Sequence, residues 1–541
     1  MRRTTLLAAV AILALSVGGA APAAGQGNPS SATGGGGGGV FRWANDGDVN
    51  SMDPYARNET FLLSFNANIY EPLVRRNREL KVEPALAASW EQPSPTVWRF
   101  RLREGVRFSD GTPFTADDVV FSADRVRAGG SNLTSVLASV KAVRAVDERT
   151  VEFETHRPNP ILVEEITTWG IMSRRWAEAN NATRSADLTT REENFATRNA
   201  MGTGPFVLAA REPDRRTTLR PNPLWWDRPE HNLREATLNV VANDATRVAA
   251  LLSGEVDMVY TVPPQDTERL SRSPGLRVLQ RPELRTIYLG MDQARDELLK
   301  SDVRGRNPFR DVRVRRAAQL AIDLDALRTR VMRGQSRSTG LMIGPGVNGH
   351  TEAADRPVRA DPEAARRLLA EAGYPNGFGV TLDCPNDRYV NDEAVCTALV
   401  PMLARVGIRV SLVAQTRARY FAEILAPRYN TSFFMLGWTP ATYDAHNALF
   451  NLMASRQGQR GVFNSGGYSN PRFDELVERI GVETNAAERQ AMIDEAMRIH
   501  AEDVGHIPLH QQTVVWAVRD TVELQQMADN YFPLRFVRVR P

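Results

Sequence analysis

Residues 97–119 read VWRFRLREGVRFSDGTPFTADDV, and this stretch decides the fold class. Its first seven residues alternate apolar and basic side chains, which predicts a half-buried β-strand. The SDG triplet that follows is a turn signal. Thr115 with Asp118 three residues later forms a capping-box-like pair, which predicts the start of a helix. A strand, a turn and a helix in immediate succession indicate a mixed α/β protein.

A second helix is predicted further along the chain. Asp361 suits its N-cap, Pro362 its first helical position and Gly373 its end. Strand patterns at 206–208 and 238–241 are interleaved with such helices, which again favours an α/β class.

The length of the chain predicts more than one lobe. It has 541 residues, whereas a single hydrophobic core stops growing at about 250–300 residues. Hydrophobic residues make up 42% and charged residues 24%, which is ordinary globular composition. A disordered or fibrous protein is therefore excluded.

The N-terminus has the pattern of an export signal. Arg2 and Arg3 precede an apolar stretch at 6–17, and Ala21-Pro22-Ala23 offers a cleavage site. We predict a signal peptide at 1–24 and a flexible Gly-rich linker at 25–39. No Cys follows the apolar stretch, so no lipid anchor is expected; a short buried helix is the alternative.

The charge and the cysteines bear on the class of partner and on the compartment. Loss of the signal lowers the formal net charge from +3 to +1, which gives no reason to expect nucleic-acid binding. No other stretch is long and apolar enough to span a membrane. Export into an oxidising compartment predicts a disulfide between Cys384 and Cys396, with two free thiols as the alternative.

Short motifs along the chain point to one family. In order they are Tyr70-Glu71-Pro72-Leu73, Pro84-Ala85-Leu86-Ala87, Gly202-Thr203-Gly204-Pro205-Phe206, Leu252-Ser253-Gly254-Glu255-Val256-Asp257 and Gly437-Trp438-Thr439. Together with residues 97–119 they resemble family 5 extracellular solute-binding proteins, which serve ATP-driven (ABC) importers of oligopeptides, dipeptides and nickel complexes. The resemblance covers residues 40–541.

The resemblance implies a type II, three-subdomain periplasmic-binding-protein fold with a ligand cleft between two lobes. The predicted limits are 40–292 for lobe 1 with an insertion at about 81–198, 293–505 for lobe 2, and 506–541 for the return to lobe 1. It also implies a periplasmic monomer that is not an enzyme, needs no cofactor, and binds a short peptide or similar small solute. Its expected partners are the permease and ATPase subunits.

The segment 433–444 carries most of the predicted solute site. In the family the backbone here pairs with a bound peptide, so the resemblance implies contacts from Gly437, Trp438 and Thr439. Backbone pairing binds an extended peptide with little sequence preference. The alternative is that Trp438 is a core residue at the end of a strand.

One position departs from the family pattern. Peptide-binding members commonly carry an Asp three residues after the Trp, where it pairs with the peptide ammonium, and here that position is Ala441. We predict that Asp444, shielded by Tyr443, takes over this role, or that Glu59 does. The alternatives are that Asp444 caps a following helix or that the solute lacks a free amine.

Arg388 is the predicted partner of a solute carboxylate, because the family has pocket residues in this segment; a solvated surface charge is the alternative. An exported hydrolase is disfavoured, since neither a G-x-S-x-G nor an H-E-x-x-H motif is present. His506 and His510 are separated by Pro508, so no helical metal site is expected there. A sensor-type or chaperone-like binding protein stays open as an alternative function.

Overall fold

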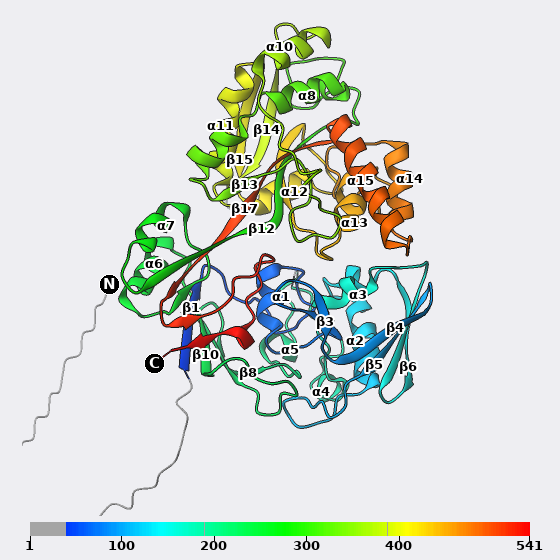
Figure 1. Ribbon diagram of the computed structural model, residues 1–541, viewed down its shortest axis with the longest axis vertical. Helices are drawn as coiled ribbons and strands as arrows, with labels where there is room; N and C mark the ends of the chain where they lie inside the picture. Colours follow the sequence, from blue (N-terminus) through cyan, green and yellow to red (C-terminus); the bar gives the residue numbers. More distant parts are fainter. Residues whose placement is uncertain (1–38, 189, 387, 541) are drawn as a thin grey trace, which may run out of the picture. The chain divides into compact units, whose positions relative to one another are not determined.

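The computed structural model describes residues 39–188, 190–386 and 388–540 (Figure 1). The predicted signal peptide and the linker up to residue 38 lie outside the described residues. The first strand, β1 (Gly39–Asn45), begins at the last residue of the predicted linker. None of the helices in the described ranges is both long and apolar enough to cross a membrane.

One 11-stranded mixed sheet organises the described residues, in the order β15-β14-β16-β12-β17-β11-β1-β10-β9-β8, with β13 paired to β17. In chain order the strands are β1, β8 (Phe206–Glu212), β9 (Arg216–Pro221), β10 (Leu233–Val240), β11 (Met258–Val259), β12 (Leu276–Met291), β13 (Ser336–Ser338), β14 (Phe378–Pro385), β15 (Ile408–Gln415), β16 (Phe433–Trp438) and β17 (His506–Arg519).

The two long strands β12 and β17 connect the two halves of this sheet (Figure 1). They pair antiparallel from Leu276 opposite Arg519 to Gly290 opposite His506, and the register shifts between Pro282 and Thr286. One end of the pair adjoins β11, and the other end adjoins β16. The second half of β12 is almost wholly buried, as expected for a strand covered on both faces.

The first half of the sheet shares its core with a separate four-stranded antiparallel sheet, β4-β5-β7-β6. Those strands are β4 (Ala87–Ser94), β5 (Val97–Leu102), β6 (Val140–Asp147) and β7 (Thr150–Thr155). The predicted strand is confirmed as β5, which buries Trp98, Phe100 and Leu102. The predicted helix is confirmed as α2 (Ala116–Arg127), where the Thr115 backbone N–H donates to the Asp118 carboxylate at 2.9 Å.

The remaining helices and strands of this half pack around the same core or close to it. They are α1 (Thr60–Asn66), β2 (Val74–Arg76), β3 (Val82–Pro84), α3 (Leu162–Glu165), α4 (Arg174–Ala179), α5 (Phe195–Arg198), α6 (Asp244–Ser253), α7 (Pro264–Ser271), β18 (Val522–Glu523) and β19 (Arg538–Val539).

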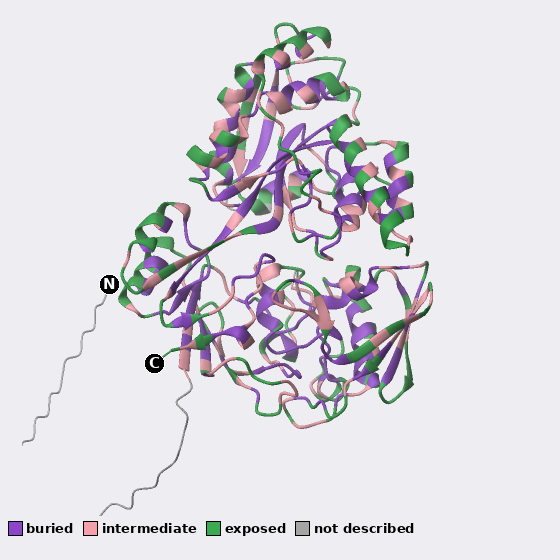
Figure 2. Cartoon of the chain, in the orientation of Figure 1, coloured by how far each residue is buried: buried purple, intermediate pink, exposed green. Residues whose placement is uncertain are grey.

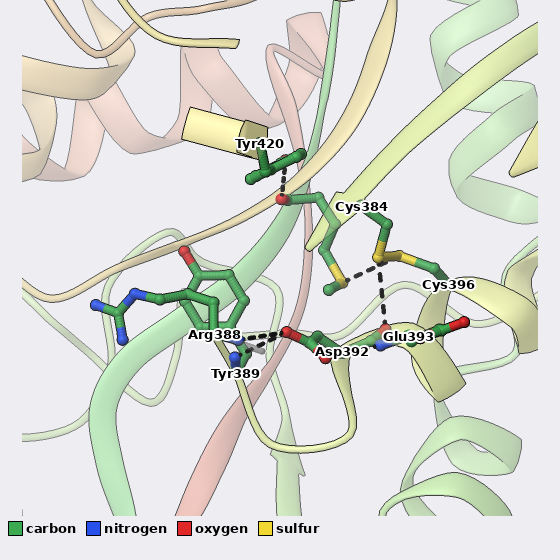
Figure 3. The surroundings of a disulfide bond; sticks show 8 residues. Cys384, Arg388, Tyr389, Asp392, Glu393, Cys396 and Tyr420 are labelled. Atoms are coloured by element: carbon green, nitrogen blue, oxygen red, sulfur yellow. Dashed lines mark hydrogen bonds between the residues drawn. A yellow bond between two sulfur atoms is a disulfide. The ribbon is translucent and has the colours of Figure 1, made fainter. Parts of the chain in front are cut away.

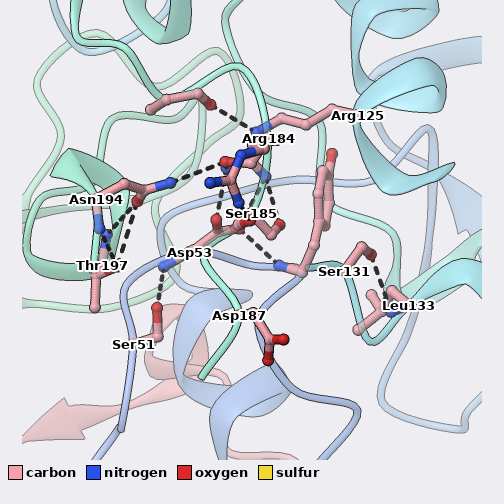
Figure 4. Close-up of polar contacts among 12 residues, drawn as sticks. Ser51, Asp53, Arg125, Ser131, Leu133, Arg184, Ser185, Asp187, Asn194 and Thr197 are labelled. Carbon is pink, nitrogen blue, oxygen red and sulfur yellow. Dashed lines mark hydrogen bonds and ion pairs between the residues drawn. The ribbon is translucent and has the colours of Figure 1, made fainter. Parts of the chain in front are cut away.

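A buried ion pair ties α2 to the first loop (Figure 4). The two guanidinium nitrogens of Arg125 lie 2.9 and 2.5 Å from the two carboxylate oxygens of Asp53, and both side chains are buried. Arg125 Nε also donates to the Ala182 carbonyl at 2.9 Å. A buried charge costs little only when it is paired and hydrogen-bonded in this way.

The second half carries most of its helices on the outside of the sheet, where their outer faces are exposed (Figure 2). They are α8 (Val312–Leu320), α9 (Leu324–Ala326), α10 (Pro362–Glu371), α11 (Asp392–Ala404), α12 (Arg417–Ile424), α13 (Ala445–Ala448), α14 (Pro471–Ile480) and α15 (Ala486–Asp503). The predicted helix is confirmed as α10: the Asp361 carboxylate accepts the Ala364 N–H at 2.9 Å, and Gly373 follows with φ +87°.

The predicted lobe limits at residues 292 and 505 fall at the ends of β12 and β17 and stay predictions. Side chains from both strands, including Leu289 and Ile507, pack into the core of the second half. The opposite ends of the same strands pack against β11 and β1, so each strand passes from one core to the other.

Candidate solute-binding site

Gly437 sits near the end of β16, where the predicted solute contacts begin. It pairs with Ile287 of β12. A Cβ at this position would lie 2.8 Å from Tyr389 Cε1 and 2.8 Å from Ile287 Cδ1, so a larger residue would force these side chains apart. On its other side β16 pairs with β14 only at residues 433 and 434 within the described residues. The backbone at 436–438 therefore has one edge without a strand partner there.

Trp438 is half-buried and packs against a hydrophobic core cluster of the second half. Its Nε1–H donates to Asn447 Oδ1 at 3.1 Å. Its ring lies 5.0 Å, centroid to centroid, from that of Phe463, which is 37% exposed. A partly accessible aromatic pair at the end of a strand is suited to packing against an apolar part of a solute.

Thr439 is held by a polar network that the sequence did not reveal. Arg285 Nε donates to Thr439 Oγ1 at 3.0 Å, and Arg285 Nη2 lies 3.3 Å from Glu283 Oε1. Gln512 Nε2 of β17 donates to the other Glu283 oxygen at 2.7 Å. The network therefore links the solute segment to both long strands at the register shift of β12.

Arg388 lies in the loop between β14 and α11 (Figure 3). The Asp392 carboxylate accepts the backbone N–H groups of Arg388 and Tyr389, both at 2.9 Å, which fixes the loop. The Arg388 guanidinium lies 5.3 Å from the centre of the Tyr389 ring, and the Arg285 guanidinium lies 5.9 Å from it. Both guanidinium groups therefore lie near the Tyr389 ring, next to Gly437.

The Arg388 guanidinium has no hydrogen bond or ion pair with any residue that the structure describes, although the side chain is half-buried. Burial is the main cause that lowers the pKa of Arg388, and the charge of Arg285 acts in the same direction. Tyr389, Glu283 and Glu59 act in the opposite direction. A half-buried cation next to another cation favours an incoming anion.

Glu59 lies in the loop directly before α1, and its side chain is exposed. Its charge is the smallest of these causes of the shift in the pKa of Arg388, and it acts against the lowering by burial. Glu59 makes no side-chain capping bond to α1.

Asp444 is occupied by structural contacts, which corrects the predicted role as an amine anchor. Its fully buried carboxylate is bidentate with Arg489, at 2.7 and 2.8 Å. It also accepts the His446 N–H at 2.8 Å, which caps α13, and the Asn348 amide at 2.7 Å. With these acceptor positions filled, the helix-cap alternative describes Asp444.

Tyr443 is likewise held by the protein rather than turned toward a solute. Its hydroxyl donates to Asp529 Oδ2 at 2.7 Å, and the Arg76 guanidinium lies 4.0 Å from the centre of its ring. Arg76 Nη2 also donates to the Thr442 carbonyl at 3.2 Å. These contacts join the loop after β16 to β2 and to the C-terminal segment.

The sulfur atoms of Cys384 and Cys396 lie 2.02 Å apart, as a disulfide that closes the loop containing Arg388 (Figure 3). His506 and His510 both lie in β17, and both are buried. Among the described residues there is no group of three or more His, Cys, Asp or Glu side chains arranged to hold a metal.

Two long strands join the halves of a large mixed sheet, and the candidate site lies at the end of β16. This arrangement defines the class of two-lobe periplasmic binding proteins. The family model of bacterial extracellular solute-binding proteins, family 5 Middle, matches residues 81–460. The chain belongs to the family 5 extracellular solute-binding proteins, which confirms the resemblance and the fold predicted from the sequence.

Individual relatives are similar to this chain over nearly its whole length. Glutathione-binding protein GsiB of Escherichia coli (strain K12) is 25% identical over 476 residues, which cover 87% of this chain and 88% of the relative. The ABC transporter-associated periplasmic binding protein DppA of Helicobacter pylori, solved with the peptide STSA, has a TM-score of 0.75 at 24% identity and covers 93% and 98%. CtaP of Listeria monocytogenes has a TM-score of 0.80 at 19% identity and covers 93% and 100%.

Proposed function

We propose that the chain is the monomeric, periplasmic receptor of an ABC importer, and that it binds a short peptide or a peptide-like solute through a carboxylate. The observation that carries this proposal is the half-buried Arg388 guanidinium, which has no hydrogen bond or ion pair among the described residues and contacts only the Tyr389 ring there. A charge-assisted hydrogen bond to a carboxylate is the strong interaction such a group lacks. Permease and ATPase subunits are the implied partners.

The neighbouring backbone supports a peptide as the solute class. The edge of β16 at 436–438 lacks a strand partner in the described residues, so an extended chain can add to it. Relatives agree with this class: GsiB is named for glutathione, and DppA was solved with a tetrapeptide. Trp438 and Phe463 offer an apolar surface for a side chain of the solute.

Pairs of peptides that differ only in their C-terminal group test the proposal. We expect calorimetry to show that peptides with a free C-terminal carboxylate bind more tightly than the same peptides as C-terminal amides. Bound peptide should also raise the melting temperature, because a ligand at 100 times its Kd adds about 2.7 kcal/mol of stability. Equal affinity for acids and amides would contradict the role of Arg388, and hydrolysis of the peptides would contradict a pure binding function.

A further inference from the structure

A pocket of about 360 Å³ lies between α8, α15 and the segment 340–358, and it shares no lining residue with the candidate solute-binding site. This volume is within the range of small-molecule sites. Its apolar lining includes Leu341, Met342, Met497 and Pro508. Methionine side chains adapt to a ligand and make favourable sulfur contacts with aromatic rings.

Two histidines supply the buried polar lining of the pocket. His500 and His506 are 3% and 2% exposed, and His500 Nε2 lies 2.9 Å from His506 Nδ1. Burial lowers the pKa of His500 to about 3 and lowers the pKa of His506 as well, so both imidazoles are neutral at pH 7.

A neutral imidazole carries one donor and one acceptor. Whichever histidine donates in the shared bond, the two remaining ring nitrogens are therefore one donor and one acceptor. Neither of them has a hydrogen-bond partner in the part of the chain that the structure describes. The ring centroids lie 5.2 Å apart, so the two free nitrogens stand at opposite ends of the pair and each can take a separate partner. A hydroxyl can bond to either of them, as an acceptor from the one or a donor to the other.

The wall formed by the segment 340–358 is fixed in place. The buried Asp355 carboxylate accepts from Thr339 Oγ1 and from the Gly340 N–H, each at 2.7 Å, and it pairs with Arg337 and His350. These contacts hold both ends of the wall and make the pocket a preformed one.

The rim of the pocket offers a cation that has no acidic partner. Arg356 is exposed and donates from Nε to the Ala353 carbonyl at 2.9 Å, but no carboxylate of the described residues lies within ion-pair distance of it. Arg498, by contrast, is paired with Glu502 at 2.7 Å. Arg316 also lines the pocket, and its guanidinium donates to Gln319 Oε1 and to the carbonyls of Ala501 and Glu502. Arg356 is therefore the lining arginine whose terminal nitrogens have no hydrogen-bond partner among the described residues.

We propose that this pocket binds a small hydroxylated aromatic carboxylate. The carboxylate pairs with Arg356, the ring lies against Met342 and Met497, and the hydroxyl bonds to one free ring nitrogen of the His500–His506 pair. The site is separate from Arg388 and does not rest on the proposed peptide-binding function.

The probe is 4-hydroxybenzoate, added to the full mature protein and followed by calorimetry and ligand-detected NMR. We expect saturable binding with a Kd of about 1 mM or tighter, the strength usual for a ligand of this size. Benzoate and 4-hydroxybenzyl alcohol, which lack the hydroxyl and the carboxylate respectively, should each bind more weakly.

Three variants locate the site. Met497→Trp fills the pocket and should abolish binding of the probe. Arg356→Ala, at an exposed position that leaves folding intact, should weaken 4-hydroxybenzoate about fivefold, because a rim ion pair is partly screened, and should leave 4-hydroxybenzyl alcohol unchanged. Arg388→Ala should leave probe binding unchanged.

The proposal is overturned if the wild type shows no saturable binding, if binding survives Met497→Trp, or if Arg356→Ala has no effect on 4-hydroxybenzoate. Loss of the probe in Arg388→Ala would assign it to the solute-binding site and overturn the proposal as well. If Met497→Trp fails to fold, as judged by its melting temperature, the Arg356→Ala comparison decides.

Discussion

Two arginines of the second half, Arg489 and Arg388, stand in opposite situations. Arg489 is 5% exposed, and all three of its donor nitrogens are used, two by Asp444 and one by the Ile480 carbonyl at 3.0 Å. Arg388 is half-buried, and its guanidinium has no hydrogen bond or ion pair among the described residues. A buried charge that has a countercharge stabilises the fold. A half-buried charge that has none, near the edge of a strand, is available to a ligand.

The largest effect is expected from breaking the matched pair. Asp444→Asn keeps an oxygen that can cap α13 but leaves Arg489 buried without its countercharge, so we expect a loss of about 3–5 kcal/mol of stability. Thermal and urea unfolding measure this. Replacing both partners, as in Asp444→Asn with Arg489→Met, should cost less than the single change. Weakened binding of an amine-bearing solute at unchanged stability would restore the anchor role of Asp444.

The ion pair of Asp444 and Arg489 predicts that the stability of the fold depends on pH. The hydrogen bonds and charge of Arg489 outweigh burial and lower the pKa of Asp444 below its usual value. A lowered carboxylate pKa contributes stability above the unfolded-state pKa of about 3.9, and this contribution is lost as the pH falls through the folded-state value. Unfolding followed below about pH 4 should therefore show a steeper loss of stability for the wild type than for Asp444→Asn.

A somewhat smaller effect is expected from opening the Arg388 loop. The disulfide of Cys384 and Cys396 closes a sequence separation of 12, so replacing both by Ser should cost about 3 kcal/mol on the chain-entropy model. Peptide affinity should fall as well, because the loop that presents Arg388 loses a constraint. Calorimetry and melting curves measure the two effects. Two alkylatable thiols in the unreduced, denatured wild type would refute the bond.

Removing the unmatched arginine should affect binding alone. Arg388→Ala should weaken a peptide with a free carboxylate by about 1.5–3 kcal/mol, the worth of a hydrogen bond to a charged group. Its melting temperature should stay close to that of the wild type, since among the described residues the guanidinium has no hydrogen bond or ion pair to lose, only its contact with the Tyr389 ring. Arg388→Lys keeps the charge without the planar fork and should retain part of the affinity. A large loss of stability in Arg388→Ala would instead make Arg388 a structural residue.

Local patterns were enough to predict β5, α2 and α10, because alternation and capping residues act within a few positions. The helix cap of Asp444 was one of the predicted alternatives, but its ion pair could not be predicted in this way, since its partner Arg489 lies 45 residues further along the chain. Glu283 and Arg285 were missed for the same reason: the contact of Glu283 with Gln512 spans 229 residues and exists only once β12 and β17 pair. The one available signal was the position of Glu283 and Arg285 just before the apolar end of β12 at 287–291.

The smallest effect is expected from the network that links Thr439 to the long strands β12 and β17. Thr439→Val removes the hydroxyl that Arg285 Nε holds at 3.0 Å and nearly conserves the shape of the side chain. Arg285→Lys keeps the positive charge, but a lysine cannot reproduce both the bond to Thr439 and the fork toward Glu283. If the network positions the edge of β16 for a solute, each change should weaken peptide binding by about 0.5–1.5 kcal/mol, the worth of one hydrogen bond.

In the double variant the losses should be less than additive, because both changes remove the same contact. A double-mutant cycle on peptide affinity measures this coupling, with a melting-temperature cycle as its control. Strict additivity in affinity would show that Arg285 and Thr439 act independently, and the coupling of the site to β12 and β17 would then have to run through Gly437 and Ile287 alone.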